Sequence, residues 1–156
     1  MKDARWLEVD ADIASAISHF EQSTALFRKG GFDRAGLEGY QASMALMHAL
    51  QSGHTSLEGG LLRILEMLSE ERPAGDDWHM ALIRRVATKL PKRRPAILSA
   101  ALSEAADETR RFRHRAVHNY DSFRVAEIGQ TIRAAELLAA RLKTEIEAFR
   151  RAIDPG

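Results

Sequence analysis

The residues of this chain whose types and spacing suit chemistry lie in one short stretch, residues 113 to 120 (RHRAVHNY). An arginine keeps its charge at any working pH and presents a planar fork of donors that suits a phosphate group. A histidine gains and loses protons near neutral pH. Arg113 and His118 would therefore suffice to bind or cleave a phosphodiester without a metal ion.

Their chemistry predicts a division of labour between these two residues. His118 would activate the ribose 2′-hydroxyl or protonate the leaving 5′-oxygen, and Arg113 would stabilise the charge that develops on the phosphoryl group. If the attacking group is the 2′-hydroxyl, the substrate must be RNA. His114 and Asn119 are the accessory candidates of the stretch.

A metal site and a cofactor are both disfavoured. His114 and His118 have the four-residue spacing of metal ligands on one helix face, but no third ligand is near them in the sequence and the chain has no cysteine. We expect no bound metal and no cofactor, because no phosphate-binding glycine loop is present either.

The spacing of Arg113 and His118 raises a geometric question. Residues five apart on an ideal helix project about 140° from one another, so a straight helix would not aim both at one phosphate. The helix could break just before His118, since residues 119 to 122 are typical of turns and caps. Alternatively, two chains could combine their motifs across a two-fold axis.

At these residues the chain resembles the HEPN superfamily, and within it the HepT-like ribonuclease toxins. The signature of those toxins is an arginine, then four to six residues, then a histidine followed after one residue by a tyrosine, as in Arg113, His118 and Tyr120. His114 stands where the family often has asparagine. The resemblance extends over nearly the whole chain, because the motif precedes the last long helix of an all-helical domain.

The resemblance implies a homodimeric, metal-independent endoribonuclease toxin with its active sites at the dimer interface. It also implies a partner, a minimal nucleotidyltransferase antitoxin of the MntA type that transfers AMP onto Tyr120. Packing of the Tyr120 ring against the last helix is the other interpretation of that residue. A catalytically silent HEPN module that binds nucleic acid or a nucleotidyltransferase is the alternative function, and a purely structural helical dimer is a third.

Length and charge agree with an RNA-binding domain. The 156 residues fit a single domain, and the net charge of +1 hides an asymmetry, because residues 1–75 carry −4 and residues 76–156 carry +5. Arg110, Arg111 and Arg115 are expected to steer RNA to the motif, although a solvated helix face explains them equally well. The absence of cysteine and of any long apolar run leads us to expect a cytoplasmic protein without a membrane span.

Helical periodicity dominates the sequence and predicts an all-α antiparallel bundle of four to five helices. The expected helices cover residues 10–29, 33–68, 77–90, 95 to the motif, and 124–153, the last with a coiled-coil-like apolar seam. Asp33 and Pro95 are the expected start signals of the second and fourth helices.

Five residues outside the motif also carry predictions. Gly53 and Gly60 share one face of the second helix and indicate a bend or the close approach of another helix. His54 and Glu58 are interpreted as an ordinary pair on the helix surface, with a supporting position behind the motif as the alternative. His79 is expected to cap or pack rather than to catalyse.

Overall fold

Five α-helices make up most of the computed structural model, which describes residues 4–118 and 124–154. They are α1 (Arg5–Lys29), α2 (Leu37–Met67), α3 (Trp78–Ala87), α4 (Ala100–His118) and α5 (Gly129–Ile153), with a short 3-10 helix, η2 (Val125–Glu127), before α5. No strand occurs within these ranges, so the predicted all-α bundle is confirmed. None of the described helices is both long enough and apolar enough to cross a membrane.

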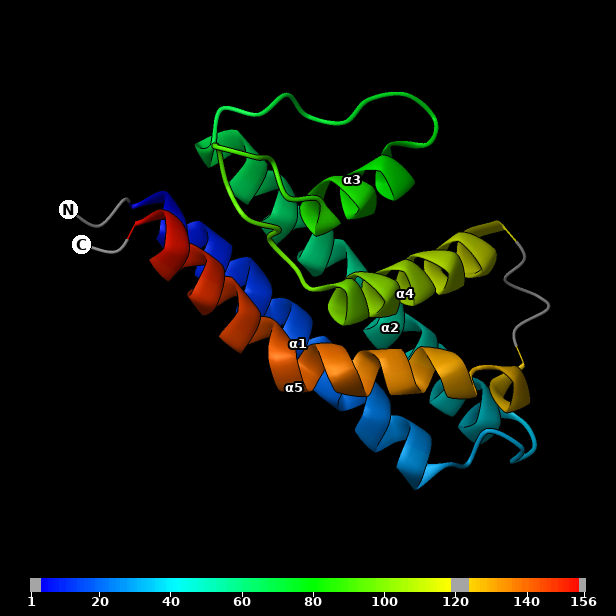
Figure 1. Ribbon diagram of the computed structural model, residues 1–156. Helices are drawn as coiled ribbons and strands as arrows, with labels where there is room; N and C mark the ends of the chain where they lie inside the picture. Colours follow the sequence, from blue (N-terminus) through cyan, green and yellow to red (C-terminus); the bar gives the residue numbers. More distant parts are fainter. Residues whose placement is uncertain (1–3, 119–123, 155–156) are drawn as a thin grey trace.

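The long helices form an antiparallel layer on which the shorter ones rest. In Figure 1, α1 runs antiparallel to both α2 and α5, and the start of α1 lies beside the end of α5. Helices α3 and α4 cover the opposite side of α2, and α4 also packs against α5. The C-terminal half of α4, which carries the motif, is thereby placed beside α2 and α3.

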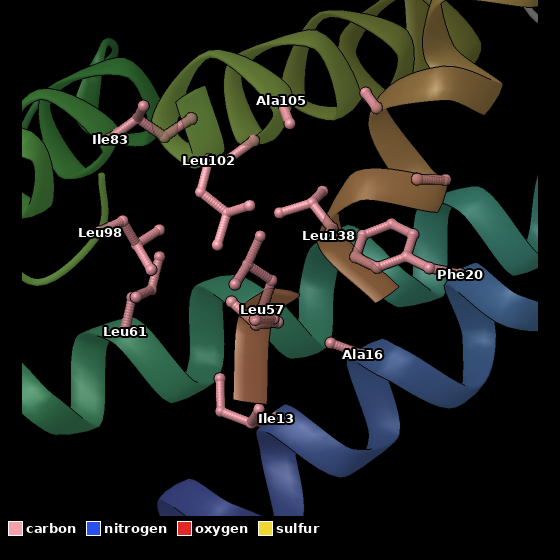
Figure 2. Packing of buried hydrophobic residues seen from close by; sticks show 14 of the residues in the cluster. Ile13, Ala16, Phe20, Leu57, Leu61, Ile83, Leu98, Leu102, Ala105 and Leu138 are labelled. Atoms are coloured by element: carbon pink, nitrogen blue, oxygen red, sulfur yellow. The ribbon is translucent and has the colours of Figure 1, made fainter. Parts of the chain in front are cut away.

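The apolar stripes of all five helices meet in one core. Figure 2 shows Leu57 of α2, Leu102 of α4 and Leu138 of α5 converging from three sides, and all three are fully buried. The apolar seam predicted for the last helix faces this core within one chain, since Ile132, Leu142 and other seam positions are buried there. The seam therefore gives no support to a purely structural dimer.

Gly53 and Gly60 mark the closest approach of α1 to α2. A methyl group at Gly53 would lie 2.7 Å from Cε1 of Phe20, and one at Gly60 would lie 2.9 Å from Cδ1 of Ile13. Both distances are shorter than real carbon contacts, so neither position has room for a side chain. The predicted close approach of another helix is confirmed.

The predicted helix starts need three corrections. Helix α1 begins at Arg5 rather than near residue 10, because Trp6 and Val9 already belong to the core. Helix α2 begins at Leu37 after Gly36, whose φ of 70° ends the preceding turn, and Asp33 is not its cap. The predicted starts of these two helices are thus four to five residues from the observed ones.

The third correction concerns the connection from α3 to α4. Helix α3 ends at Ala87 rather than near residue 90, and Pro95 does not open α4. Ser99 does so instead, because its Oγ accepts a hydrogen bond from the backbone nitrogen of Leu102 at 3.2 Å. The segment between the two helices, residues 88–99, contains no α-helix.

A buried arginine holds this segment. Arg94 is only 5% exposed and donates two hydrogen bonds to the carboxylate of Glu70, from Nε at 2.5 Å and from Nη2 at 3.0 Å. It also donates to the carbonyl oxygens of Thr88 and Arg85. The hydrogen bond from Arg94 lowers the pKa of Glu70. Arg94 is thus a structural residue, because its charge is buried and paired with Glu70.

Candidate functional site

One face of α4 lines a pocket of about 340 Å³ against α2 and the start of α3. The α4 residues follow a spacing of three and four, which puts them on a single helix face. The lining residues are Arg110, Arg113, His114, Val117 and His118 of α4, His54 of α2, and Asp76, Asp77, His79 and Met80 from the start of α3. The pocket is within the size range of small-molecule sites.

Arg113 and His118 form opposite edges of this face. Arg113 is half-buried, and its Nε donates a hydrogen bond to Oγ1 of Thr55 on α2 at 3.1 Å. His118 is exposed at the last described residue of α4. Both side chains line the same pocket of one chain, although α4 is unbroken up to His118. The prediction that they do not aim at one phosphate from a straight helix stays a prediction. The pocket is wide enough to include both edges of the face.

His114 lies between these two residues on the pocket face. Its ring is 4.4 Å from the ring of His118, centroid to centroid, with the two planes tilted by 53°. Within residues 4–118 and 124–154, no group of three or more His, Asp or Glu side chains is arranged to hold a metal ion. The two imidazoles and Arg113 therefore form a cationic and titratable surface.

The other arginines of the predicted RNA-binding set differ in position. Arg110 lines the pocket and donates to Asp107 at 2.7 Å. Arg111 bonds Asp107 and Glu108 at 2.8 and 2.6 Å, and Arg115 lies 3.9 Å from Glu108, so these two charges are paired outside the pocket lining. Asn119 and Tyr120 lie outside the described residues. Helix α4 continues through His118, so the break suggested just before His118 does not occur.

Beneath the pocket lies a buried cluster that the sequence did not reveal, formed by His54, Glu58, His79 and Thr109. His54 is 1% exposed and Glu58 is 4% exposed, so the prediction of a surface pair is wrong. His79 Nδ1 lies 2.6 Å from Oε2 of Glu58, and His54 Nε2 lies 3.2 Å from the same oxygen. His54 Nδ1 lies 2.7 Å from Oγ1 of Thr109.

The hydrogen bonds of this cluster indicate which ring nitrogen of His54 carries a hydrogen. The Thr109 hydroxyl donates to the carbonyl of Ala106 at 3.0 Å, so it accepts the hydrogen of His54 Nδ1. Nε2 of His54 is close to Glu58 but is not aligned for a hydrogen bond, and it is buried without another partner. Its contact with the carboxylate is therefore electrostatic rather than a well-formed hydrogen bond.

Glu58 is held as a carboxylate by its two histidines. Burial is the largest single effect on the pKa of Glu58 and raises it, but the interactions of the carboxylate with His54 and then with His79 together outweigh burial. The net result is a pKa below the ordinary value. His79 is also packed on the Trp78 ring, with centroids 3.7 Å apart and planes inclined by 29°, so the predicted packing role describes part of its environment.

The position of His54 in the sequence contained a signal for this burial. Leu50, His54, Leu57 and Leu61 follow the spacing of one helix face, and the three leucines are core residues. A histidine and a glutamate on an apolar helix face indicate that the pair is buried, whereas the same pair on a polar face does not. Their partner His79 is 21 residues from Glu58, and the sequence spacing did not connect the two.

The largest hollow lies elsewhere and is less suited to chemistry. It has a volume of about 860 Å³ and is lined by residues of α1, the second half of α2 and the segment after it, among them Asp12 and Arg63. Arg63 donates to Asp12 at 2.8 Å and to Glu8 at 2.6 Å, so its charge is already paired. No histidine lines this hollow. The α4 pocket is therefore the candidate site.

The fold and the pocket define an all-helical protein whose candidate site combines arginine and histidine side chains on one helix. A family model described as HepT-like protein matches residues 45–153, which is more than half of the chain. The chain therefore belongs to the HepT-like family. The matched region includes every residue of the pocket and leaves α1 outside. The searches of curated proteins and of solved structures found no match.

Proposed function

We propose that this protein is a metal-independent endoribonuclease and the toxin of a HepT/MntA-like toxin-antitoxin pair. The observation that carries the proposal is the joint placement of Arg113, His114 and His118 on one pocket. Membership in the HepT-like family supports it independently. The remaining assignments rest on the chemistry of these side chains.

In the proposed reaction the ribose 2′-oxygen attacks the adjacent phosphorus and the 5′-oxygen leaves. The products are a 2′,3′-cyclic phosphate and a 5′-hydroxyl. Arg113 stabilises the additional negative charge on the phosphoryl oxygens, and its hydrogen bond to Thr55 limits the orientations of its guanidinium. His118 transfers one of the two protons that must move. His114, beside it, is an accessory group.

The proposal includes two macromolecular contacts. A second copy of the chain would cover the motif face, and Val117 supports this because it is an apolar side chain left 59% exposed between His114 and His118. A nucleotidyltransferase antitoxin would inactivate the toxin by transferring AMP to Tyr120. The adduct would add negative charge and bulk two residues from His118 and exclude the RNA phosphate.

Cleavage of RNA in excess EDTA tests the proposal. Wild-type protein is expected to cleave, whereas His118→Ala and Arg113→Ala are expected to lose about 100-fold or more in rate. His48→Ala is the matched control, because His48 is an exposed histidine of α2 outside the pocket. Equal cleavage by wild type and His118→Ala would exclude the catalytic assignment. RNA binding without any cleavage would favour the catalytically silent module.

A further inference from the structure

We propose that His79 is a second catalytic histidine of the pocket, acting as the general base that takes the proton of the ribose 2′-hydroxyl while Glu58 and His54 hold it in place. This inference rests on the proposed ribonuclease function and extends it to a residue outside the Arg113 to Tyr120 motif. It also completes the reaction, because two protons must move and His118 alone accounts for one.

The environment of the His79 ring has the features of an oriented base. Nδ1 is bound to Glu58 at 2.6 Å, and the ring rests on Trp78, so its plane is fixed from two directions. Nε2 has no hydrogen-bond partner among the described residues, and the side chain is 32% exposed where it lines the pocket with Arg113 and His118. A fixed imidazole with one free nitrogen, in a side chain that lines the same pocket as Arg113, is suited to proton transfer.

Glu58 determines which nitrogen of His79 is free. As a carboxylate it accepts only, so Nδ1 of His79 carries the hydrogen and Nε2 of the neutral ring carries the lone pair. The same carboxylate stabilises the imidazolium that forms when Nε2 takes up a proton. Glu58 is therefore a positioning residue for a base. His118 has no carboxylate partner among the described residues, and we assign it to the acid.

The roles of His79 and His118 account for both protons that move in the reaction. Nε2 of His79 removes the proton from the 2′-hydroxyl as the bond from the 2′-oxygen to phosphorus forms. The bond from phosphorus to the 5′-oxygen breaks, and the imidazolium of His118 gives its proton to that oxygen. The two histidines end with exchanged protonation states and return to the starting state through water.

His54 contacts the same carboxylate oxygen of Glu58 as His79 does. It is buried, it is anchored through Nδ1 to Thr109 of α4, and its Nε2 lies 3.2 Å from that oxygen. Because Thr109 is one turn before Arg113, this chain of contacts ties the position of His79 to the helix that carries the motif. His54 is a positioning residue and does not touch the substrate.

The experiment compares two versions of one RNA in EDTA. After the bond cleaved by the wild type has been mapped, a second oligoribonucleotide is made with sulfur in place of the bridging 5′-oxygen at that bond. Thiols are much stronger acids than alcohols, so a thiolate leaves without taking up a proton. The sulfur substrate therefore makes the acid unnecessary and leaves the base necessary.

The expected pattern separates the two histidines. His79→Ala should lower kcat by about 10²- to 10⁴-fold on both substrates. His118→Ala should show a similar loss on the oxygen substrate and recover to within about tenfold of wild type on the sulfur substrate. Glu58→Gln should follow His79→Ala with a smaller loss, about tenfold or more, in kcat rather than in KM. His48→Ala serves as the control on both RNAs.

The possible outcomes separate the role of His79 from the ribonuclease proposal. Wild-type activity of His79→Ala or His79→Gln would overturn the role of His79 and leave the ribonuclease proposal standing. Recovery of the activity of either variant on the sulfur substrate would have the same consequence. A wild type that cleaves no RNA would overturn both proposals. Because His79 is partly exposed in the first turn of α3, its replacement should keep the fold, which circular dichroism melting verifies.

Discussion

Glu58 shows how much a single carboxylate can depend on its neighbours. It is buried beside two imidazoles of different helices, and both of them lower its pKa and so favour its ionised form. A carboxyl buried alone would shift its pKa upward and become neutral. Glu58 therefore links the stability of the pocket to its protonation state.

This linkage predicts an acid-sensitive stability. Since the pKa of Glu58 is lowered in the folded protein, its contribution is fully present above its usual pKa of 4.5 and is lost as pH falls below that value toward the folded pKa. Glu58→Gln should destabilise the protein at pH 7 by about 1–3 kcal/mol and lose less further stability on acidification than wild type does. Urea unfolding at pH 7 and pH 3.5 measures both effects.

Glu104→Gln is the matched control for this measurement, because Glu104 is an exposed carboxylate of α4. Its unfolding free energy should follow that of wild type at both pH values within about 0.5 kcal/mol. If the free energy of unfolding of Glu58→Gln depended on pH as that of wild type does, the Glu58 carboxylate would not be the cause of the acid sensitivity.

Among the helices, the contact of α1 with α2 is the most tightly specified by sequence. Gly53→Ala should destabilise the protein by about 1–3 kcal/mol, because the added methyl meets the buried ring of Phe20 and the overpacking exceeds the gain in helix propensity. Gly59→Ala is the control, since its methyl would meet only the flexible end of Asp12 at 3.3 Å. The urea concentration at the midpoint of unfolding should fall for Gly53→Ala and stay equal or rise for Gly59→Ala.

The segment between α3 and α4 depends on a different kind of interaction. Arg94→Met should cost about 3 kcal/mol, because it leaves the carboxylate of Glu70 partly buried with only Arg85, at 3.7 Å, as its remaining partner. Arg93→Met should change stability by less than about 0.5 kcal/mol, since Arg93 is exposed. Thermal melting of the two variants side by side checks the difference. Equal melting temperatures would mean that Arg94 does not hold the segment.

The elements differ in how far their positions could be predicted from sequence. Apolar spacing predicted five helices and the buried face of α5, and the pair Gly53 and Gly60 predicted a close helix contact, because these signals are local. The pairing of Glu58 with His79 and of Arg94 with Glu70 could not be predicted in the same way. Both join residues more than 20 positions apart, and spacing along one helix contains no information about a partner on another.

At the scale of the whole molecule, the two halves of the chain that differ in charge form different helices of one bundle. The acidic half of the sequence forms α1 and α2, whereas the basic half forms α3, α4 and α5. Many arginines of the basic half are nonetheless paired with carboxylates, including Arg94, Arg110 and Arg111. Net charge alone therefore overstates the cationic surface, and Arg113, which has no carboxylate partner among the described residues, should contribute more to RNA binding than its neighbours.

The salt dependence of RNA binding tests this ranking. With a 2′-O-methyl oligonucleotide, which lacks the attacking hydroxyl and is not cleaved, affinity should fall steeply as salt rises because phosphate contacts release counterions. Arg113→Ala should reduce the slope of log affinity against log salt by about one, and Arg111→Ala by clearly less, because Arg111 is already paired with Asp107 and Glu108. Arg63→Ala, on the far side of α2 beside Asp12, should leave the slope unchanged. An equal reduction by all three variants would mean that RNA responds to overall charge rather than to the pocket.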